Sequence, residues 1–108
     1  MMTDYKILGQ SANDGSEENL YSVPASKSAV VRAINVTNTS STADTFDIIF
    51  VSSSASSTTD TDYLFKTHEI LGNETITIKG GYTMEENNTL RIKSTNGTST
   101  FHAFGGEI

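Results

Sequence analysis

The stretch from Leu20 to Asn38 constrains the fold more than any other part of this chain. It contains the only proline, Pro24, and the residue before a proline is pushed out of the helical region, so the backbone there must be extended. From Ala29 to Thr37 the chain is rich in β-branched and small apolar residues, which favour a strand. The stretch therefore predicts a turn at the proline followed by a long strand.

The two faces of this expected strand differ along its length. Both faces are apolar at its start and only one stays apolar at its end, which is typical of a strand in the middle of a sandwich. Arg32 is the one polar residue on the face expected to be buried. That face carries Val30, Ile34 and Val36, and the other face carries Ala29, Val31 and Ala33 before Asn35 and Thr37.

Seven further segments are expected to be short strands, because each carries apolar or aromatic residues between polar turns. They are residues 4–10, 20–23, 45–52, 63–66, 74–79, 90–93 and 99–104. Strands that follow one another at a spacing of roughly ten residues indicate an all-β fold. We predict a single antiparallel β-sandwich of about eight short strands, either jelly-roll or Ig-like.

Two strand pairings are predicted from the connections. Strands 29–37 and 45–52 are joined by a short polar loop, which suggests an antiparallel hairpin. Strands 90–93 and 99–104 flank Asn96-Gly97, the strongest short-range signal for a two-residue hairpin turn.

Three segments are expected to interrupt the strands. Gly80-Gly81 should end the strand at 74–79. Residues 84–88 should form a turn or a single helical turn, and this is the only place where helix is expected. Residues 53–61 are all Ser, Thr, Ala or Asp, and they are expected to form a mobile surface loop that buries nothing.

The expected core consists of the inward apolar residues of these strands. It comprises Ile7, Leu20, Val30, Ile34, Val36, Phe46, Ile48, Phe50, Phe65, Ile76, Ile78, Leu90, Ile92 and Phe101.

Composition narrows the possible partners. With 108 residues the chain is expected to be one domain, residues 1–108, with a short N-terminal strand or arm at 1–10. There is no cysteine, so the fold cannot depend on disulfides or thiolate metal sites.

A net charge of −6 argues against nucleic acid as a partner. No apolar run reaches the length of a membrane span and no signal peptide is visible, so we expect no membrane partner and synthesis in a cytoplasm.

No motif in the sequence points to catalysis, a cofactor or a metal. His68 and His102 could be combined with serines and aspartates on paper, but the nucleophile elbow Gly-x-Ser-x-Gly is missing. Asp60 and Asp62, Asp44 with Asp47, or Glu85 with Glu86 lack the spacing of a calcium loop. Tyr5, Tyr21, Tyr63 and Tyr82 could form a sugar-stacking platform, but they fit half-buried strand positions better. The sequence therefore predicts a protein that is not an enzyme and holds no cofactor.

Three stretches carry a resemblance to a known class of proteins. They are Asp4–Ser11, Leu20–Val31 with its Tyr-Ser-Val-Pro-Ala, and Asn35–Asn38, and the chain closes with Phe104-Gly105-Gly106-Glu107-Ile108. In these features the chain resembles small β-sandwich virion structural proteins of tailed bacteriophages, especially marine ones. The resemblance covers nearly the whole chain, and its motifs are strand and turn residues rather than catalytic ones.

The resemblance implies a capsid decoration (cement) protein. Such a protein would be assembled in the host cytoplasm, bind the major capsid protein on the outer surface of the virion, and form a homo-oligomer at local symmetry axes. The edge strand with Tyr5, Lys6, Ile7 and Leu8 is the expected docking segment. The alternative is a tail, baseplate or fibre-associated module that binds a host receptor or carbohydrate, since jelly rolls are common in lectins.

Overall fold

The protein is an antiparallel β-sandwich, as predicted. The computed structural model describes residues 4–52 and 58–108. The strands are β1 (Asp4–Ala12), β2 (Glu18–Ser22), β3 (Ala29–Asn38), β4 (Asp44–Val51), β5 (Tyr63–Ile70), β6 (Thr75–Met84), β7 (Thr89–Ser94) and β8 (Ser99–Glu107), and the 3-10 turn η1 (Asp60–Asp62) precedes β5. Each of the eight expected strands corresponds to one of these, although most are longer than their apolar patterns indicated.

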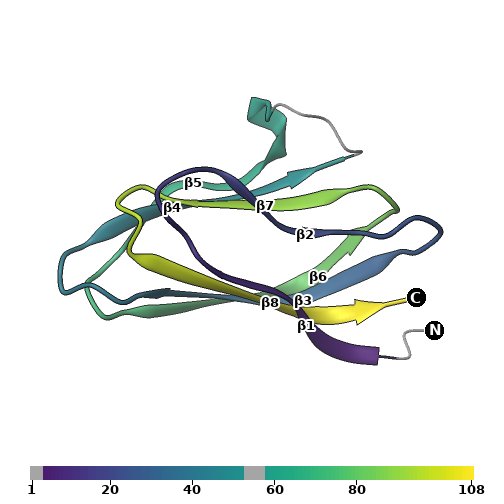
Figure 1. The fold of residues 1–108 in the computed structure, drawn as a ribbon, viewed down its shortest axis with the longest axis horizontal. Coiled ribbons are helices and arrows are strands. Elements are labelled where there is room, and N and C mark those ends of the chain that lie inside the picture. Colours follow the sequence, from purple (N-terminus) through teal and green to yellow (C-terminus); the bar gives the residue numbers. More distant parts are fainter. Residues whose placement is uncertain (1–3, 53–57) are drawn as a thin grey trace.

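The strand order is that of a jelly roll rather than an Ig-like sandwich. One sheet, sheet A, has the order β1-β8-β3-β6, and the other, sheet B, has the order β2-β7-β4-β5 (Figure 1). First and last strands therefore pair, as do second and seventh, third and sixth, and fourth and fifth, all antiparallel. This is one long hairpin rolled up so that its successive strand pairs alternate between the two sheets, which is the jelly-roll arrangement.

Both predicted hairpins are wrong. β3 lies in sheet A and β4 in sheet B, and the same separation holds for β8 and β7. At the Asn96-Gly97 turn, Gly97 has a positive φ of 70°, whereas Asn96 does not have the positive φ that a two-residue hairpin turn of this sequence requires. The turn occurs where it was predicted, but it carries the chain from one sheet to the other, so a local turn signal did not identify the partner strand.

A bulge at Arg32 explains the mixed faces of β3. The register shifts between Val31 and Ala33 against both neighbouring strands. Before the bulge Val31 points into the core, and after it Ile34 does. The expectation that Val30 is a core residue is therefore wrong, because the extra residue exchanges the two faces of the strand.

The strand β6 continues through Gly80-Gly81, which was expected to end it. The two glycines lie opposite Arg32 of β3, since Val31 pairs with Tyr82 and Ala33 with Lys79. They form a bulge rather than a break, and the strand runs on to Met84. Residues 85–88 then form a turn without helix, and the short 3-10 turn lies instead at 60–62.

One apolar core fills the space between the sheets. Most of the expected core residues are buried, and Phe50, Phe65 and Ile76 are partly buried against it. Ile7 is an exception, because it is 52% exposed on edge strand β1. Residues that the expected set lacked include Val31, Ile70, Met84 and Ala103.

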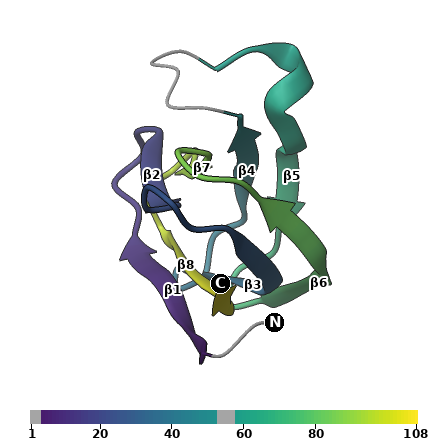
Figure 2. The same cartoon turned by 90° about the vertical axis from the view of Figure 1, so that its right-hand side faces the viewer.

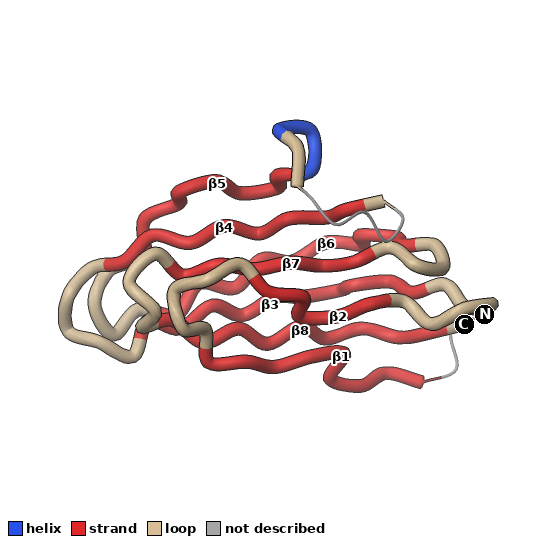
Figure 3. Tube along the Cα trace, turned by 45° about the horizontal axis from the view of Figure 1, so that its top comes forward, coloured by secondary structure: helices blue, strands red, loops and turns tan. Residues whose placement is uncertain are grey.

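The antiparallel strands place the connections at two ends of the sandwich. We call one the loop end, formed by residues 13–17, 39–43, 71–74 and 95–98, whose loops crowd together in Figure 3. The other is the terminus end, formed by residues 23–28 and 85–88, the end of β4, the start of β1 and the C-terminus. Figure 2 shows the molecule with the start of β1 and the C-terminus toward the viewer.

Candidate interaction surfaces

All four edge strands carry a bulge. β1 and β6 are the edges of sheet A, and β2 and β5 are the edges of sheet B. The register against the neighbouring strand shifts at Leu8 in β1, at Gly80-Gly81 in β6, at Leu20 in β2 and at Lys66-Thr67 in β5. Bulges bend an edge and disturb its ladder, which hinders uncontrolled pairing with other chains. A partner that adds to one of these strands must therefore use the stretch on one side of its bulge.

The predicted docking residues Tyr5, Lys6, Ile7 and Leu8 lie on edge strand β1, as expected, but they do not form one surface. Ile7 is exposed, whereas Leu8 is partly buried against the core. The Lys6 ammonium lies 2.8 Å from a Glu107 carboxylate oxygen. For Tyr5 only the backbone is described, opposite Gly106. Their role in docking stays a prediction, with Ile7 as the side chain available to a partner.

Glu107 joins the two sheets near the termini. One carboxylate oxygen faces Lys6, and the other accepts a 2.5 Å hydrogen bond from the Tyr21 hydroxyl of β2 in the opposite sheet. These two hydrogen bonds hold the pKa of Glu107 below its usual range. Burial, together with the bond to Glu107, raises the pKa of Tyr21. The three side chains form a clasp, which we call the Glu107 clasp.

Buried polar side chains close the loop end. Asp44 accepts hydrogen bonds through Oδ2 from the hydroxyls of Ser94 and Ser99, and through Oδ1 from the Asn96 N–H at 2.9 Å. Asn38 donates to the carbonyl of Thr42 and accepts from Ser40 and Thr98. Asn13 donates to Ser16 and Glu18 and accepts from the N–H of Ser94 and Gly15. We call these residues the loop-end network.

The electrostatics of Asp44 fit a structural role. Burial on its own raises the pKa of this carboxyl, but the hydrogen bonds from Ser94, Asn96 and Ser99 outweigh burial and lower the pKa. The carboxylate is therefore held charged and occupied by donors of its own chain. Such a group positions loops and has little capacity left for a ligand.

The outer face of sheet B carries a buried arginine. Arg91 is 7% exposed, and its Nε donates to Asn19 Oδ1 at 3.0 Å. Its Nη1 donates to Thr58 Oγ1 at 3.0 Å and lies 3.7 Å from a Glu17 carboxylate oxygen. Within the segment expected to be a mobile loop, residues 53–57 lie outside the described residues. Thr58, which follows them, is half-buried and hydrogen-bonded, so the expectation of a loop that buries nothing is wrong at this residue.

Tyr21, Tyr63 and Tyr82 do not form a common platform. They lie on β2, β5 and β6, and Tyr21 is buried at the Glu107 clasp. The Lys66 ammonium lies 4.8 Å from the centre of the Tyr63 ring. His68 packs against the rings of Phe46 and Phe65, and His102 stacks on Phe104 at 6.3 Å.

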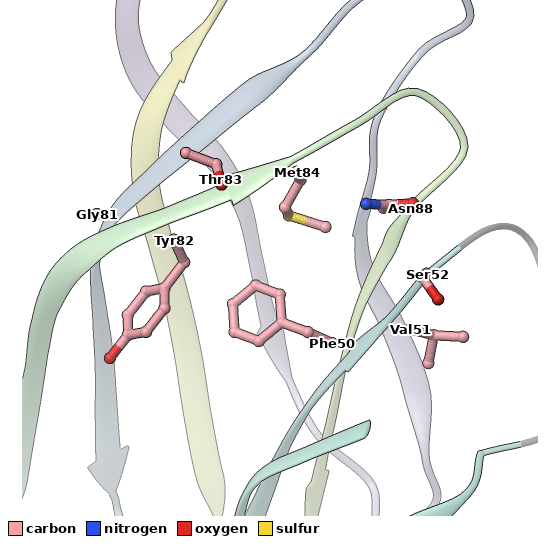
Figure 4. A pocket seen from close by; sticks show the side chains of 8 residues that line it. All are labelled: Phe50, Val51, Ser52, Gly81, Tyr82, Thr83, Met84 and Asn88. Carbon is pink, nitrogen blue, oxygen red and sulfur yellow. The ribbon is translucent and has the colours of Figure 1, made fainter. Parts of the chain in front are cut away.

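A hollow of about 420 Å³ opens at the terminus end between β4 and β6. It is lined by Phe50, Val51, Ser52, Gly81, Tyr82, Thr83, Met84 and Asn88 (Figure 4). The rings of Phe50 and Tyr82 lie side by side with centroids 5.4 Å apart. Its size is within the range of ligand pockets, and its walls combine aromatic, thioether and polar side chains.

Sequence analysis missed this hollow. The sequence places Phe50 in the core and Tyr82 at a half-buried strand position without relating the two, and both are half-buried at the same opening. The Gly80-Gly81 bulge before Tyr82 was the only available signal, because glycines inside a strand often mark a place where something approaches the backbone.

Across residues 4–52 and 58–108, no group of three or more His, Cys, Asp or Glu side chains is arranged to hold a metal ion. In the same part of the chain, no helix has the length and apolar character of a membrane span. Comparison of the chain with protein-family models, with curated proteins and with solved structures finds no match.

Proposed function

We propose that this protein is a non-enzymatic structural component of a tailed-phage virion. It is a capsid decoration protein that binds the major capsid protein on the outer surface of the shell. A ligand that binds the assembled shell and not its loose subunits shifts the equilibrium toward the shell, and the protein stabilises the capsid in this way.

The observation that carries the proposal is the resemblance of residues 20–31 and 104–108 to phage virion proteins. These two stretches are far apart in the sequence but meet in the fold. Val30 pairs with Gly106 and Val31 with Gly105, and Ser28 and Ile108 exchange backbone hydrogen bonds. A Cβ at Gly105 would lie 1.9 Å from the Val30 carbonyl oxygen, so glycine is required at this contact. The motif therefore has a physical reason in the architecture of this sandwich.

Fold and charge support the same proposal. The jelly roll is used by viral capsid and lectin domains. A net charge of −6 favours a protein that stays dispersed at high copy number. The exposed side chain of Ile7 on edge strand β1 offers an apolar contact for the capsid surface.

A receptor- or carbohydrate-binding module of the tail is the second candidate. The observation that favours it is the hollow with the Phe50 and Tyr82 rings, because aromatic side chains in a pocket are a common feature of ligand sites.

The decisive experiment is the copy number per virion, measured by quantitative mass spectrometry of purified particles against the major capsid protein. Hundreds of copies are expected for a capsid decoration protein. A few copies to a few tens would place the protein on the tail or portal and favour the second candidate. Absence from the particle would contradict both.

The role of β1 is tested by Ile7→Ser. If Ile7 contacts the capsid, this substitution lowers occupancy of shells to which the purified protein is added back. Leu71→Ser is the matched control, because Leu71 is 57% exposed at the opposite end of the sandwich. Equal occupancy of the shells by both variants would show that β1 is not part of the docking surface.

A further inference from the structure

The hollow lies where β4 of sheet B extends beyond the first residue of its neighbour β5. Along β4, pairing with β5 ends at Ile49, which lies opposite Tyr63. On its other side β4 continues beside β7 to Val51, which lies opposite Thr89. Among the described residues, Phe50 and Val51 thus have a neighbouring strand on one side only. The free side of a strand presents backbone N–H and C=O groups that can pair with another chain.

The lining residues show that the hollow lies beside strand edges rather than over a sheet face. Phe50 packs against the core, and Val51 points to the opposite face of β4, yet both line the hollow. The consecutive residues Gly81–Met84 of β6 line it as well. Because successive side chains of a strand point to opposite faces, consecutive residues share a surface only along the edge. The edges of β4 and β6 therefore face each other across this space.

We propose that the hollow is a slot for an extended segment of a partner protein, which adds to β4 on the side that has no neighbouring strand among the described residues. The segment would pair with β4 beyond Ile49, where β4 no longer pairs with β5. One of the apolar side chains of the segment would enter between Phe50, Tyr82 and Met84. Main-chain hydrogen bonds supply affinity in this mode, and side-chain pockets supply specificity. About three residues of an extended chain fit along Phe50–Ser52 at the usual rise per residue. As a second attachment to the capsid, this inference rests on the proposed function.

Charge specifies the partner segment further. Glu85 and Glu86 directly follow Met84 at one border of the slot, and both are exposed. Asp60 and Asp62 precede Tyr63, where β5 leaves β4. Acidic residues on both sides favour a segment with lysine or arginine at its ends, since complementary charge guides and orients association. The occupant is therefore an extended segment with alternating apolar residues and basic ends.

The test uses ¹⁵N-labelled protein and a panel of blocked seven-residue peptides. Each peptide alternates valine or leucine with threonine between terminal lysines, and a matched panel carries proline at the centre, which removes a main-chain donor. We expect the first panel to shift the amide signals of residues 50–52 and 81–84, and the proline panel to leave them unchanged.

Two variants with matched controls test the slot itself. A Cβ at Gly81 meets no atom within 4 Å, so Gly81→Phe can place its ring in open space and is expected to weaken peptide binding at least about tenfold. Thr77→Phe, at an exposed position of β6 outside the slot, should change it less than about twofold. Glu85→Lys should weaken binding, and Glu69→Lys, at an exposed position of β5, should not. Glu85→Lys tests the slot even if Gly81→Phe does not fold.

Three results would overturn the inference. They are a lack of shifts at residues 50–52 and 81–84, equal shifts with the proline panel, or displacement of bound peptide by simple sugars such as glucose and N-acetylglucosamine, which would make the hollow a glycan site. Copy number per virion is an independent measurement. Hundreds of copies without peptide binding remove the slot and leave the decoration protein, whereas peptide binding by a protein absent from particles removes the decoration protein and assigns the slot to another partner.

Discussion

The two ends of the sandwich are built in opposite ways. At the loop end, buried side chains of Asn13, Asn38 and Asp44 connect loops that come from different parts of the chain. At the terminus end, the Glu107 clasp joins the sheets on one side, while on the other side the hollow separates β4 from β6. Polar side-chain contacts therefore close the loop end, whereas the terminus end contains open space between β4 and β6.

Backbone packing shows the same contrast. At the loop end a Cβ on Gly72 would lie 2.2 Å from the Ser41 carbonyl oxygen, so two loops are in direct backbone contact. At the terminus end a Cβ on Gly81 would meet no atom within 4 Å. Near this opening Thr89 Oγ1 is buried without a hydrogen-bond partner among the described residues, whereas the hydroxyls of Ser94 and Ser99 at the loop end both donate to Asp44. Substitutions should therefore cost more at the loop end.

The largest effect is expected for Asp44→Ala. The change leaves the hydroxyls of Ser94 and Ser99 and the N–H of Asn96 without their common acceptor, and the free energy of unfolding should fall by about 3 kcal/mol. Urea denaturation measures this loss. Asp60→Ala, on the exposed turn η1, is the control and should change stability by less than about 0.5 kcal/mol. Equal effects would contradict the assignment of the loop-end network as a lock.

A pH dependence follows from the same carboxylate. The folded-state pKa of Asp44 lies below that of an ordinary aspartate, about 3.9, so its contribution is fully present above about pH 4 and is lost as the pH falls through the folded-state value. Glu107 has a lowered pKa and contributes with the same sign. Urea midpoints measured between about pH 6 and pH 3 should fall less steeply for Asp44→Asn than for the wild type. Parallel profiles would show that Asp44 is not the group responsible.

A smaller effect is expected at the Glu107 clasp. Tyr21→Phe removes the hydroxyl that donates to Glu107 while keeping the ring, and it should lower the free energy of unfolding by about 1 kcal/mol. Tyr63→Phe is the matched control, because the ring beside Lys66 is retained and none of the described hydrogen bonds is removed. If Tyr21→Phe lowered the free energy of unfolding as much as Asp44→Ala does, polar side chains would stabilise the two ends to the same extent.

The strands could be predicted from the sequence because alternation is a local property. In β4, for example, the spacing of Phe46, Ile48 and Phe50 indicated both the strand and its inward face. The conflict at Arg32, a charged residue on an otherwise apolar face, was a readable sign of the bulge that exchanges the faces of β3. The prediction assumed that inward and outward side chains alternate regularly along this strand, and it therefore placed Val30 in the core.

Strand pairing and the hollow could not be predicted because they depend on contacts between distant residues. The Asn96-Gly97 turn has the sequence of a hairpin, but the Asn96 N–H donates to Asp44 and its side-chain amide donates to Ala43. Those contacts hold the turn between two sheets. The hollow exists because β5 leaves β4 at Tyr63 while β4 runs on to Val51, and nothing in either strand's own pattern specifies that mismatch.

The smallest effect expected distinguishes the two ends most directly. Gly81→Ala should raise the free energy of unfolding by about 0.5 kcal/mol, because the added methyl group meets no atom and the unfolded chain loses backbone freedom. The same change at Gly72 should lower stability by about 2 kcal/mol, since the methyl group would force the Ser41 carbonyl away. Urea denaturation of both variants measures the difference. Loss of stability in both variants would mean that the terminus end is packed as tightly as the loop end. In that case there would be no space for a partner segment beside β4.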